Sequence, residues 1–181
     1  MFVISLSIPI LLFLCFKERF KNTNNILLLL FTSVIFLNPF FRTSSFWGLE
    51  ENYAYITLLL SLLYLMKLEN IKKKSNLTIY IELSILTLAS SLCIYFDQKF
   101  IIIPLICFLK IMNLSLLIRF KIFSVFLYFI FSIPFLYLIY TWKGIFPKDI
   151  YNLGNNYFIH HIGFTLTMIA FNILPFLLII K

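Results

Sequence analysis

Charged residues are scarce in this chain, and alanine and glycine are rarer still. Only 12% of the 181 residues are charged, whereas 62% are hydrophobic; an average soluble domain carries about twice that share of charge. Apolar runs recur along the whole length, and several reach the roughly 17–25 residues that cross a hydrocarbon layer as helix. The composition therefore excludes an ordinary soluble domain. It predicts an all-α, polytopic transmembrane helix bundle, with residues 1–181 as one integral membrane domain.

Three alanines and four glycines stand against 23 phenylalanines. Small residues let membrane helices approach closely, so their scarcity predicts that the spans pack through bulky side chains. Cys15, Cys93 and Cys107 lie singly in apolar runs, which indicates small core residues and neither a disulfide framework nor a metal site. No cofactor is evident, and a divalent cation stays open because no ligand spacing identifies one.

Seven apolar segments predict about six or seven spans. Ten Lys and Arg follow the odd-numbered segments and four follow the even-numbered ones. Basic residues near span ends mark the cytoplasmic side, so this bias predicts an outward N-terminus and a cytoplasmic C-terminus. The segments are Phe2–Phe16, Ile26–Phe41, Gly48–Met66, Leu77–Phe96, Phe100–Ile118, Ile122–Trp142 and Tyr157–Ile180.

The first segment has no positive charges before it and several after it, which is not the pattern of a signal peptide. Two explanations remain open: a natural anchor with an outward N-terminus, or a longer protein with further spans before Met1. The net charge of +8 sits in short loops between spans. Loops of this kind lie near anionic lipid, so the expected partner is membrane lipid and not nucleic acid.

The outward stretch Asn38–Tyr55, "NPFFRTSSFWGLEENYAY", places Arg42, Trp47, Glu50 and Glu51 close together. One interpretation is structural: a Ser or Thr caps a helix, the two acids occupy its first turn, and the aromatic residues lie at the membrane interface. The other is functional. In it, Arg42 binds a phosphate at the membrane surface, while one of the glutamates orients a polar acceptor.

Other polar residues are candidates for the same outer cleft. Gln98 and Lys99 lie in the turn after the fourth segment, which is either a hairpin tip or part of this cleft. Lys110 interrupts the fifth segment, where a cation is costly unless it snorkels or pairs, so it is a candidate for function. His160 and His161 point about 100° apart on a helix and cannot hold one metal together. They are interfacial residues, or one of them lines a polar cleft.

Three stretches carry a resemblance to a known family. They are "NPFFRTSSFWGLEENYAYITLLLSLLYL" (Asn38–Leu65), "IPFLYLIYTWKGIFP" (Ile133–Pro147) and "HHIGFTLTMIAFNILPFLL" (His160–Leu178). In this order they resemble the GT-C superfamily of membrane glycosyltransferases. Within it, they are similar to the α-1,2-glucosyltransferases of lipid-linked oligosaccharides and their bacterial relatives.

The resemblance implies transfer of a sugar from a polyprenyl-phosphate carrier to an acceptor on the outer face of a bacterial inner membrane. A lipid-linked sugar donor would be the partner, a carboxylate would activate the acceptor hydroxyl, and cations would stabilise the leaving phosphate. The family's catalytic acid lies in a first outward loop, which would precede this chain. The resemblance therefore implies the middle part of a larger GT-C core, without its N-terminal catalytic loop.

This sequence also departs from the family at the Asp97-Gln98 turn, where relatives carry Arg-Gln and where Lys99 would replace the lost cation. A different class of protein remains open as the alternative: a non-catalytic membrane subunit, or a carrier for a lipid or polar solute. In a carrier, Lys110 with Pro104 and Pro134 would shape a path through the bundle.

Overall fold

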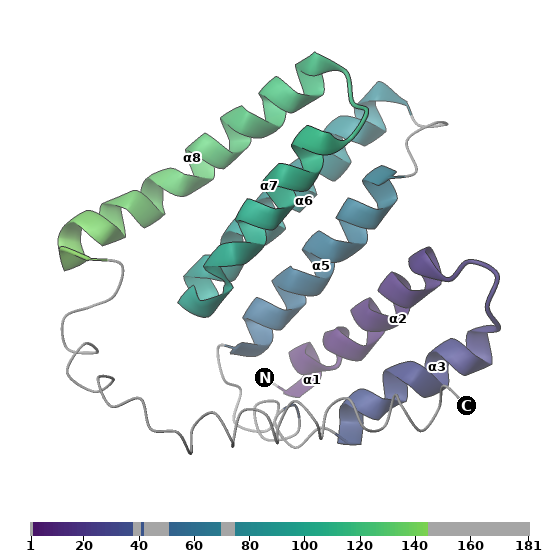
Figure 1. The fold of residues 1–181 in the computed structure, drawn as a ribbon. Helices are drawn as coiled ribbons and strands as arrows, with labels where there is room; N and C mark the ends of the chain where they lie inside the picture. The colour runs from purple at the N-terminus through teal and green to yellow at the C-terminus, as the bar shows by residue number, and fades with distance from the viewer. Residues whose placement is uncertain (1, 38–40, 42–50, 70–74, 145–181) are drawn as a thin grey trace, which may run out of the picture. The chain divides into compact units, whose positions relative to one another are not determined.

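The described part of the chain is built from helices joined by turns, and it contains no strand (Figure 1). The structure, a computed structural model, describes residues 2–37, 41, 51–69 and 75–144. The chain divides into two compact units, Met1–Ile133 and Pro134–Lys181, with the boundary inside α8 at a proline. The helices are α1 Phe2–Ser5, α2 Ser7–Arg19, α3 Asn25–Ser33, η1 Val34–Leu37, α5 Glu51–Glu69, α6 Asn76–Phe96, η3 Gln98–Ile101, α7 Ile102–Asn113 and α8 Ile118–Trp142.

Polar side chains set the start of two helices. Asn24 Oδ1 accepts a hydrogen bond from the Ile26 N–H (3.0 Å) at the start of α3. Ser75 Oγ accepts one from the Thr78 N–H (3.3 Å) at the start of α6. These caps satisfy N–H groups that have no partner within the first turn of a helix.

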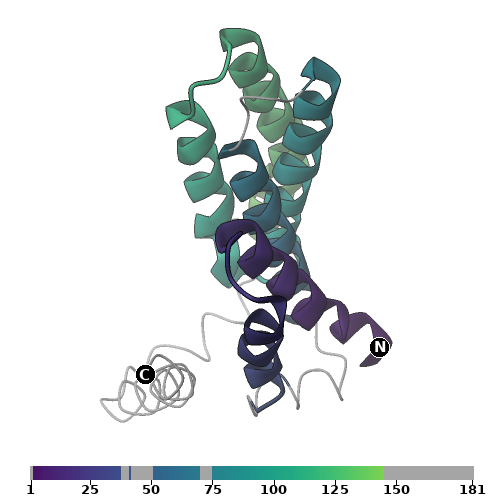
Figure 2. The same cartoon turned by 90° about the vertical axis from the view of Figure 1, so that its right-hand side faces the viewer.

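Side-chain contacts fix the directions of the helices in the first unit. Asn52 Nδ2 donates to Ser5 Oγ (3.1 Å), and the Cys15 thiol donates to the Leu59 carbonyl (3.4 Å), so α2 and α5 run parallel. α5, α6 and α7 lie side by side and alternate in direction (Figure 2). Consecutive helices therefore enter and leave the bundle at the same two ends.

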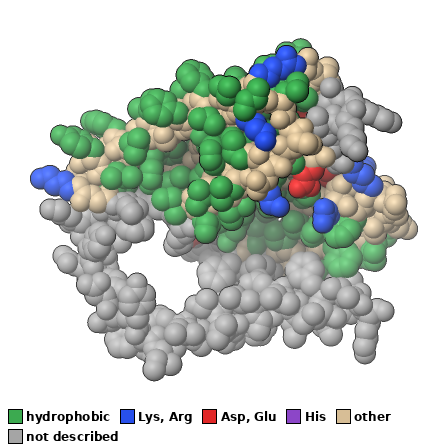
Figure 3. Space-filling model, turned by 45° about the horizontal axis from the view of Figure 1, so that its top comes forward, with side chains coloured by type: hydrophobic (Ala, Val, Ile, Leu, Met, Phe, Trp, Pro, Cys, Tyr) green, Lys and Arg blue, Asp and Glu red, His purple; other side chains and the backbone are tan. Residues whose placement is uncertain are grey.

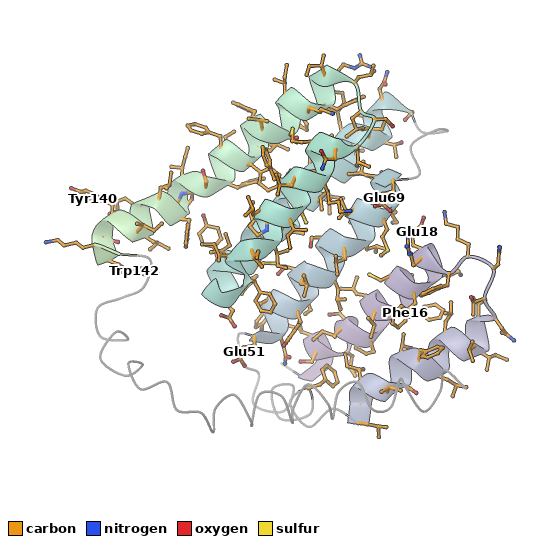
Figure 4. All side chains as sticks on the ribbon, in the orientation of Figure 1. Phe16, Glu18, Glu51, Glu69, Tyr140 and Trp142 are labelled. Atoms are coloured by element: carbon orange, nitrogen blue, oxygen red, sulfur yellow. The ribbon has the colours of Figure 1, made fainter. Side chains whose placement is uncertain are left out.

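We name these two ends by residues of α5. The Glu51 end is where α5 and α7 begin and α6 ends, and the Lys67 end is where α5 and α7 end and α6 and α8 begin. α2 also ends at the Lys67 end, because it runs parallel to α5. Glu18 and Glu69 accordingly lie at matching ends of the two helices, opposite Glu51 (Figure 4).

The α5–α6 seam, the most extensive helix contact, is lined by small residues. The Cys93 thiol of α6 lies 3.2 Å from Thr57 Oγ1 and 3.8 Å from the Ala54 carbonyl, both on α5. Ser61 lies one turn after Thr57 and Ala89 one turn before Cys93, and both are buried. Small side chains at this spacing let two helix backbones approach closely. The prediction that the spans pack only through bulky side chains is therefore wrong for this pair.

α8 packs in the opposite way, through aromatic rings. The Tyr80 ring lies edge-on to Phe120 (centroids 4.8 Å apart) and to Phe123 (5.0 Å), and Phe108 meets Tyr128 at 5.6 Å. Edge-to-face contact is a favourable geometry for aromatic pairs. The expected bulky packing holds here. The core joins α5 to α8 through the buried residues Leu65, Leu68, Ile79, Leu83, Leu86, Cys107, Ile111, Leu116 and Phe120.

The predicted segment Leu77–Phe96 agrees with α6, and Gly48–Met66 agrees with α5, which is described from Glu51 and ends three residues later than predicted. The fifth segment is a correction. Phe100–Ile118 is not one helix: α7 ends at Asn113, and an extended turn leads into α8. Lys121 of α8 contributes to this ending, because its Nζ donates to the Met112 carbonyl (2.6 Å), one of the groups that a helix end leaves unpaired.

The remaining segments agree in part. Phe2–Phe16 corresponds to α1 and α2 with a turn between them, and Ile26–Phe41 begins as α3 and continues as η1. Ile122–Trp142 agrees with α8, which starts four residues earlier. Tyr157–Ile180 lies outside the described residues.

Two of the described helices are long and apolar enough to cross a membrane: α6, of 21 residues, and α8, of 25. Half of the apolar window of α6 is buried inside the protein, compared with 6% for α8. Large apolar side chains such as Phe126, Phe129 and Ile133 are therefore exposed along α8. In the view of Figure 3, hydrophobic side chains (green) cover much of the described surface.

The α5–α6 seam generates a matched test. Ser61 is fully buried and Ser33 of α3 is exposed, yet each hydroxyl donates to the carbonyl three residues earlier at 2.7 Å. We expect Ser61→Leu to lower the free energy of unfolding by about 1–3 kcal/mol, because a close-packed site has no room for the larger side chain. Ser33→Leu should change it by less than about 0.5 kcal/mol. Reversible unfolding in detergent micelles measures both, and equal effects would contradict a tight seam.

Candidate functional site

Aromatic pairs close the Glu51 end of the bundle. The Tyr53 ring of α5 stacks on Phe96 at the end of α6, with centroids 5.4 Å apart and planes inclined by 27°. Two residues further along α5, Tyr55 meets Phe100 of η3 edge-on at 5.5 Å. The start of α5 is thereby held against the turn that connects α6 to α7.

Carboxylates flank these rings. Glu51 is the first residue of α5 and is half-buried, and Asp97 follows the last residue of α6. The Asp97 carbonyl accepts a hydrogen bond from the Phe100 N–H (3.1 Å), which forms the turn containing Gln98 and Lys99. Of the predicted site residues, the structure thus brings Glu51, Gln98 and Lys99 to the same end of the first unit. Carboxylates beside aromatic faces can accept hydrogen bonds from the hydroxyls of a ligand while a ring packs on its apolar side.

The other predicted residues of the outer cleft lie outside the described residues. They are Arg42, Trp47 and Glu50 before α5, and His160 and His161 near the C-terminus. The prediction that acids occupy the first turn of a helix after Arg42 is confirmed for Glu51.

Lys110 is placed differently from the expectation that it interrupts a long span. It lies in the last turn of α7, a helix of 12 residues, and its side chain is exposed. The helix ends three residues later, so Lys110 belongs to the Lys67 end and not to the middle of the bundle. Sequence reasoning missed this because the apolar run continues through the turn after Asn113.

A buried polar contact near the Glu51 end was not predicted. Asn52 and Ser5 are each 3% exposed and joined by the 3.1 Å hydrogen bond between α5 and the end of α1. A buried amide without partners is costly, so this contact fixes α1 against α5. The sequence signal for this contact was one polar residue, Ser5 or Asn52, near the start of each of two apolar segments whose N-terminal ends lie at the same end of the bundle.

Further polar contacts cross the interior of the bundle. Besides the Thr57–Cys93 contact, Ser90 of α6 lies 2.9 Å from the Tyr128 hydroxyl of α8, and Ser61 lies beside Cys107 of α7. All three cysteines are free and buried, as the sequence predicted. The described residues contain no group of three or more His, Cys, Asp or Glu that could hold a metal ion.

An open groove of about 520 Å³ separates α2 from α3 and η1. Its two polar residues, Thr32 and Ser33, use their hydroxyls on carbonyls of their own helix, at 2.9 and 2.7 Å. The groove therefore offers an apolar surface. Its lining residues are Leu6, Pro9, Ile10, Phe13, Leu29, Thr32, Ser33 and Phe36.

No family model, curated protein or solved structure matches the chain. Arguments about function consequently depend on the geometry of the described residues, and above all on the different chemistry of the two ends. The Glu51 end carries Glu51, Asp97, Lys99 and aromatic rings. The Lys67 end is mainly basic: beside Glu18 and Glu69 it carries Lys67, Lys110, Arg119 and Lys121, with Lys17 and Arg19 at the end of α2.

The Asn52–Ser5 contact can be tested by a double-mutant cycle. We expect Asn52→Ala to lower the free energy of unfolding by about 1–3 kcal/mol, because it leaves the buried Ser5 hydroxyl without this partner. Adding Ser5→Ala should cost less than the sum of the two single changes. Asn113→Ala, at an exposed position, is the control for losing an amide. Additive effects would show that the two side chains do not depend on each other.

Proposed function

We propose that the chain is an integral membrane protein, a bundle of six or seven spans. The observation that carries this proposal is α8, whose 25 residues are almost unburied and mostly apolar. At 1.5 Å per residue such a helix is about 37 Å long, enough for the hydrocarbon core of about 30 Å. In water its exposed Phe, Ile and Leu side chains would form an apolar patch far larger than soluble monomers carry.

The distribution of charge supports one orientation. Within the described residues, the basic positions named above lie toward one end of the first unit, as Figure 3 shows with that end turned forward. Basic residues at span ends remain on the cytoplasmic side. The Lys67 end would then face the cytoplasm and the Glu51 end the outside.

Labelling with a membrane-impermeant maleimide tests this orientation. In a variant with Cys15, Cys93 and Cys107 changed to Ser, we expect a single cysteine at Asp97 to react in intact cells. A single cysteine at Asn22, in the α2–α3 turn, should react only after the membrane is opened. The reverse pattern would invert the proposed orientation, and reaction at both sites in intact cells would contradict membrane insertion.

For the activity, we propose a glycosyltransferase, or part of one, that uses a polyprenyl-phosphate sugar on the outer face. Support comes from the Glu51 end, where Glu51 begins α5 and Tyr55 of the same helix contacts Phe100 in the turn that contains Gln98 and Lys99. A carboxylate would take the proton of an acceptor hydroxyl as its oxygen attacks the anomeric carbon. The bond from that carbon to the phosphate oxygen breaks, and the polyprenyl phosphate leaves with the electron pair, stabilised by a cation.

The position of Lys110 gives the carrier alternative less support than the glycosyltransferase. The alternative placed Lys110 with Pro104 and Pro134 along a path through the bundle, and Lys110 lies in the exposed last turn of α7. A cation there can reach the membrane surface without a partner inside the bundle. We therefore retain the glycosyltransferase as the single proposed activity.

The activity is tested by changing one glutamate to glutamine at each end of α5. In the active enzyme, we expect Glu51→Gln to lower the turnover number for transfer of radiolabelled sugar from a polyprenyl phosphate by about 100-fold, which is the range for a misplaced acceptor hydroxyl. Arg42→Ala should also lower turnover. Glu69→Gln makes the same charge change at the opposite end of α5 and should leave turnover unchanged. Equal rates for both glutamate variants would contradict the proposal.

A further inference from the structure

Three cations lie in the turns where α7 ends and α8 begins. Lys110 is exposed in the last turn of α7, and Arg119 and Lys121 lie in the first turn of α8. The Arg119 guanidinium donates to Asn76 Oδ1 (2.9 Å), while Lys121 Nζ donates to the Met112 carbonyl (2.6 Å). We call Lys110, Arg119 and Lys121 the α7–α8 corner.

The partners that hold the corner in place are neutral. Arg119 meets an amide oxygen and lies 4.9 Å from the centre of the Phe120 ring, and Lys121 meets a backbone carbonyl. The sequence contains no acidic residue between Asp97 and Asp149. These contacts orient the cations without cancelling their charge, so the corner carries positive charge available to an anion from outside the hairpin.

Exposed apolar side chains lie directly beside the corner. Ile106 and Leu109 precede Lys110 on α7, and Ile122 follows Lys121 on α8; they are 45%, 52% and 62% exposed. Free phosphate would make no use of this apolar surface. A molecule with an anionic head and hydrocarbon chains would satisfy both the cations and these side chains.

We propose that the α7–α8 corner binds the phosphate of an anionic phospholipid, with the acyl chains along Ile106, Leu109 and Ile122. This rests on the membrane integration proposed above and is independent of glycosyl transfer. Arg119 is preorganised by Asn76, which lowers the cost of ordering its side chain around the phosphate. A lipid held there would connect α6, α7 and α8 at the cytoplasmic end, since Asn76 begins α6.

The test measures lipid binding by native mass spectrometry of the full chain in a neutral detergent. Phosphatidylglycerol is the anionic probe and phosphatidylcholine the neutral one. We expect phosphatidylglycerol to bind more tightly, and Lys110→Gln/Arg119→Gln/Lys121→Gln to weaken it by about 100-fold, from three cations at a membrane surface. Lys17→Gln/Arg19→Gln/Lys21→Gln removes the same charge at the α2–α3 turn and should weaken binding by less than about threefold.

Three results would overturn the proposal: equal affinity for the two lipids, equal losses in the two triple variants, or displacement of phosphatidylglycerol by millimolar glycerol phosphate. The last would indicate a site for a free phosphate. If circular dichroism shows that the corner variant is misfolded, Lys110→Gln alone replaces it, with an expected loss of about fivefold. Extraction of the chain from membranes by alkaline carbonate would refute integration separately, because lipid selectivity is measured in detergent.

Discussion

The close contact between α5 and α6 is the constraint on which the rest of the described structure depends. Cys93 lies against Thr57 and Ala54, with small buried residues one turn further along each helix. In a chain with so few alanines and glycines, two of the three alanines are buried on this helix pair. Where water is absent, helices gain little from burying apolar surface and associate through close packing and polar contacts. A few small residues therefore determine how closely α5 and α6 pack.

The seam also determines which residues share an end. Because α5 and α6 are antiparallel and closely packed, Tyr53 meets Phe96, and Glu51 lies at the end that also holds the turn after Asp97. α8 uses aromatic rings instead, which hold it to α6 and α7 while most of its surface stays exposed. A tightly packed pair with a more loosely attached outer helix is the arrangement that would keep a site at the Glu51 end rigid.

Much of the fold could be predicted from the sequence, because hydrophobic length and basic loops mark α5 and α6 well. The end of α7 could not. In a soluble protein a turn is polar, but Leu114, Leu116 and Leu117 continue the apolar run through this one, so hydropathy gives no signal there. The decisive contact, from Lys121 to the Met112 carbonyl, depends on tertiary structure. For the candidate site, helix-start chemistry predicted the position of Glu51, whereas the Asn52–Ser5 contact joins residues far apart in sequence and required the α2–α5 pairing.

The two ends of the first unit impose different demands on any ligand. At the Glu51 end the described charged residues are Glu51, Asp97 and Lys99, so an anionic substrate meets two carboxylates there and would depend on Lys99 and on the predicted cation Arg42. At the Lys67 end the cations are oriented by neutral partners on α6 and α7, so an anionic lipid meets no such repulsion from the α7–α8 hairpin. A lipid phosphate would therefore be more stable at the corner than at the proposed catalytic end. Under the two proposals, this difference would let the protein hold a structural lipid at the corner and release a lipid phosphate from the Glu51 end.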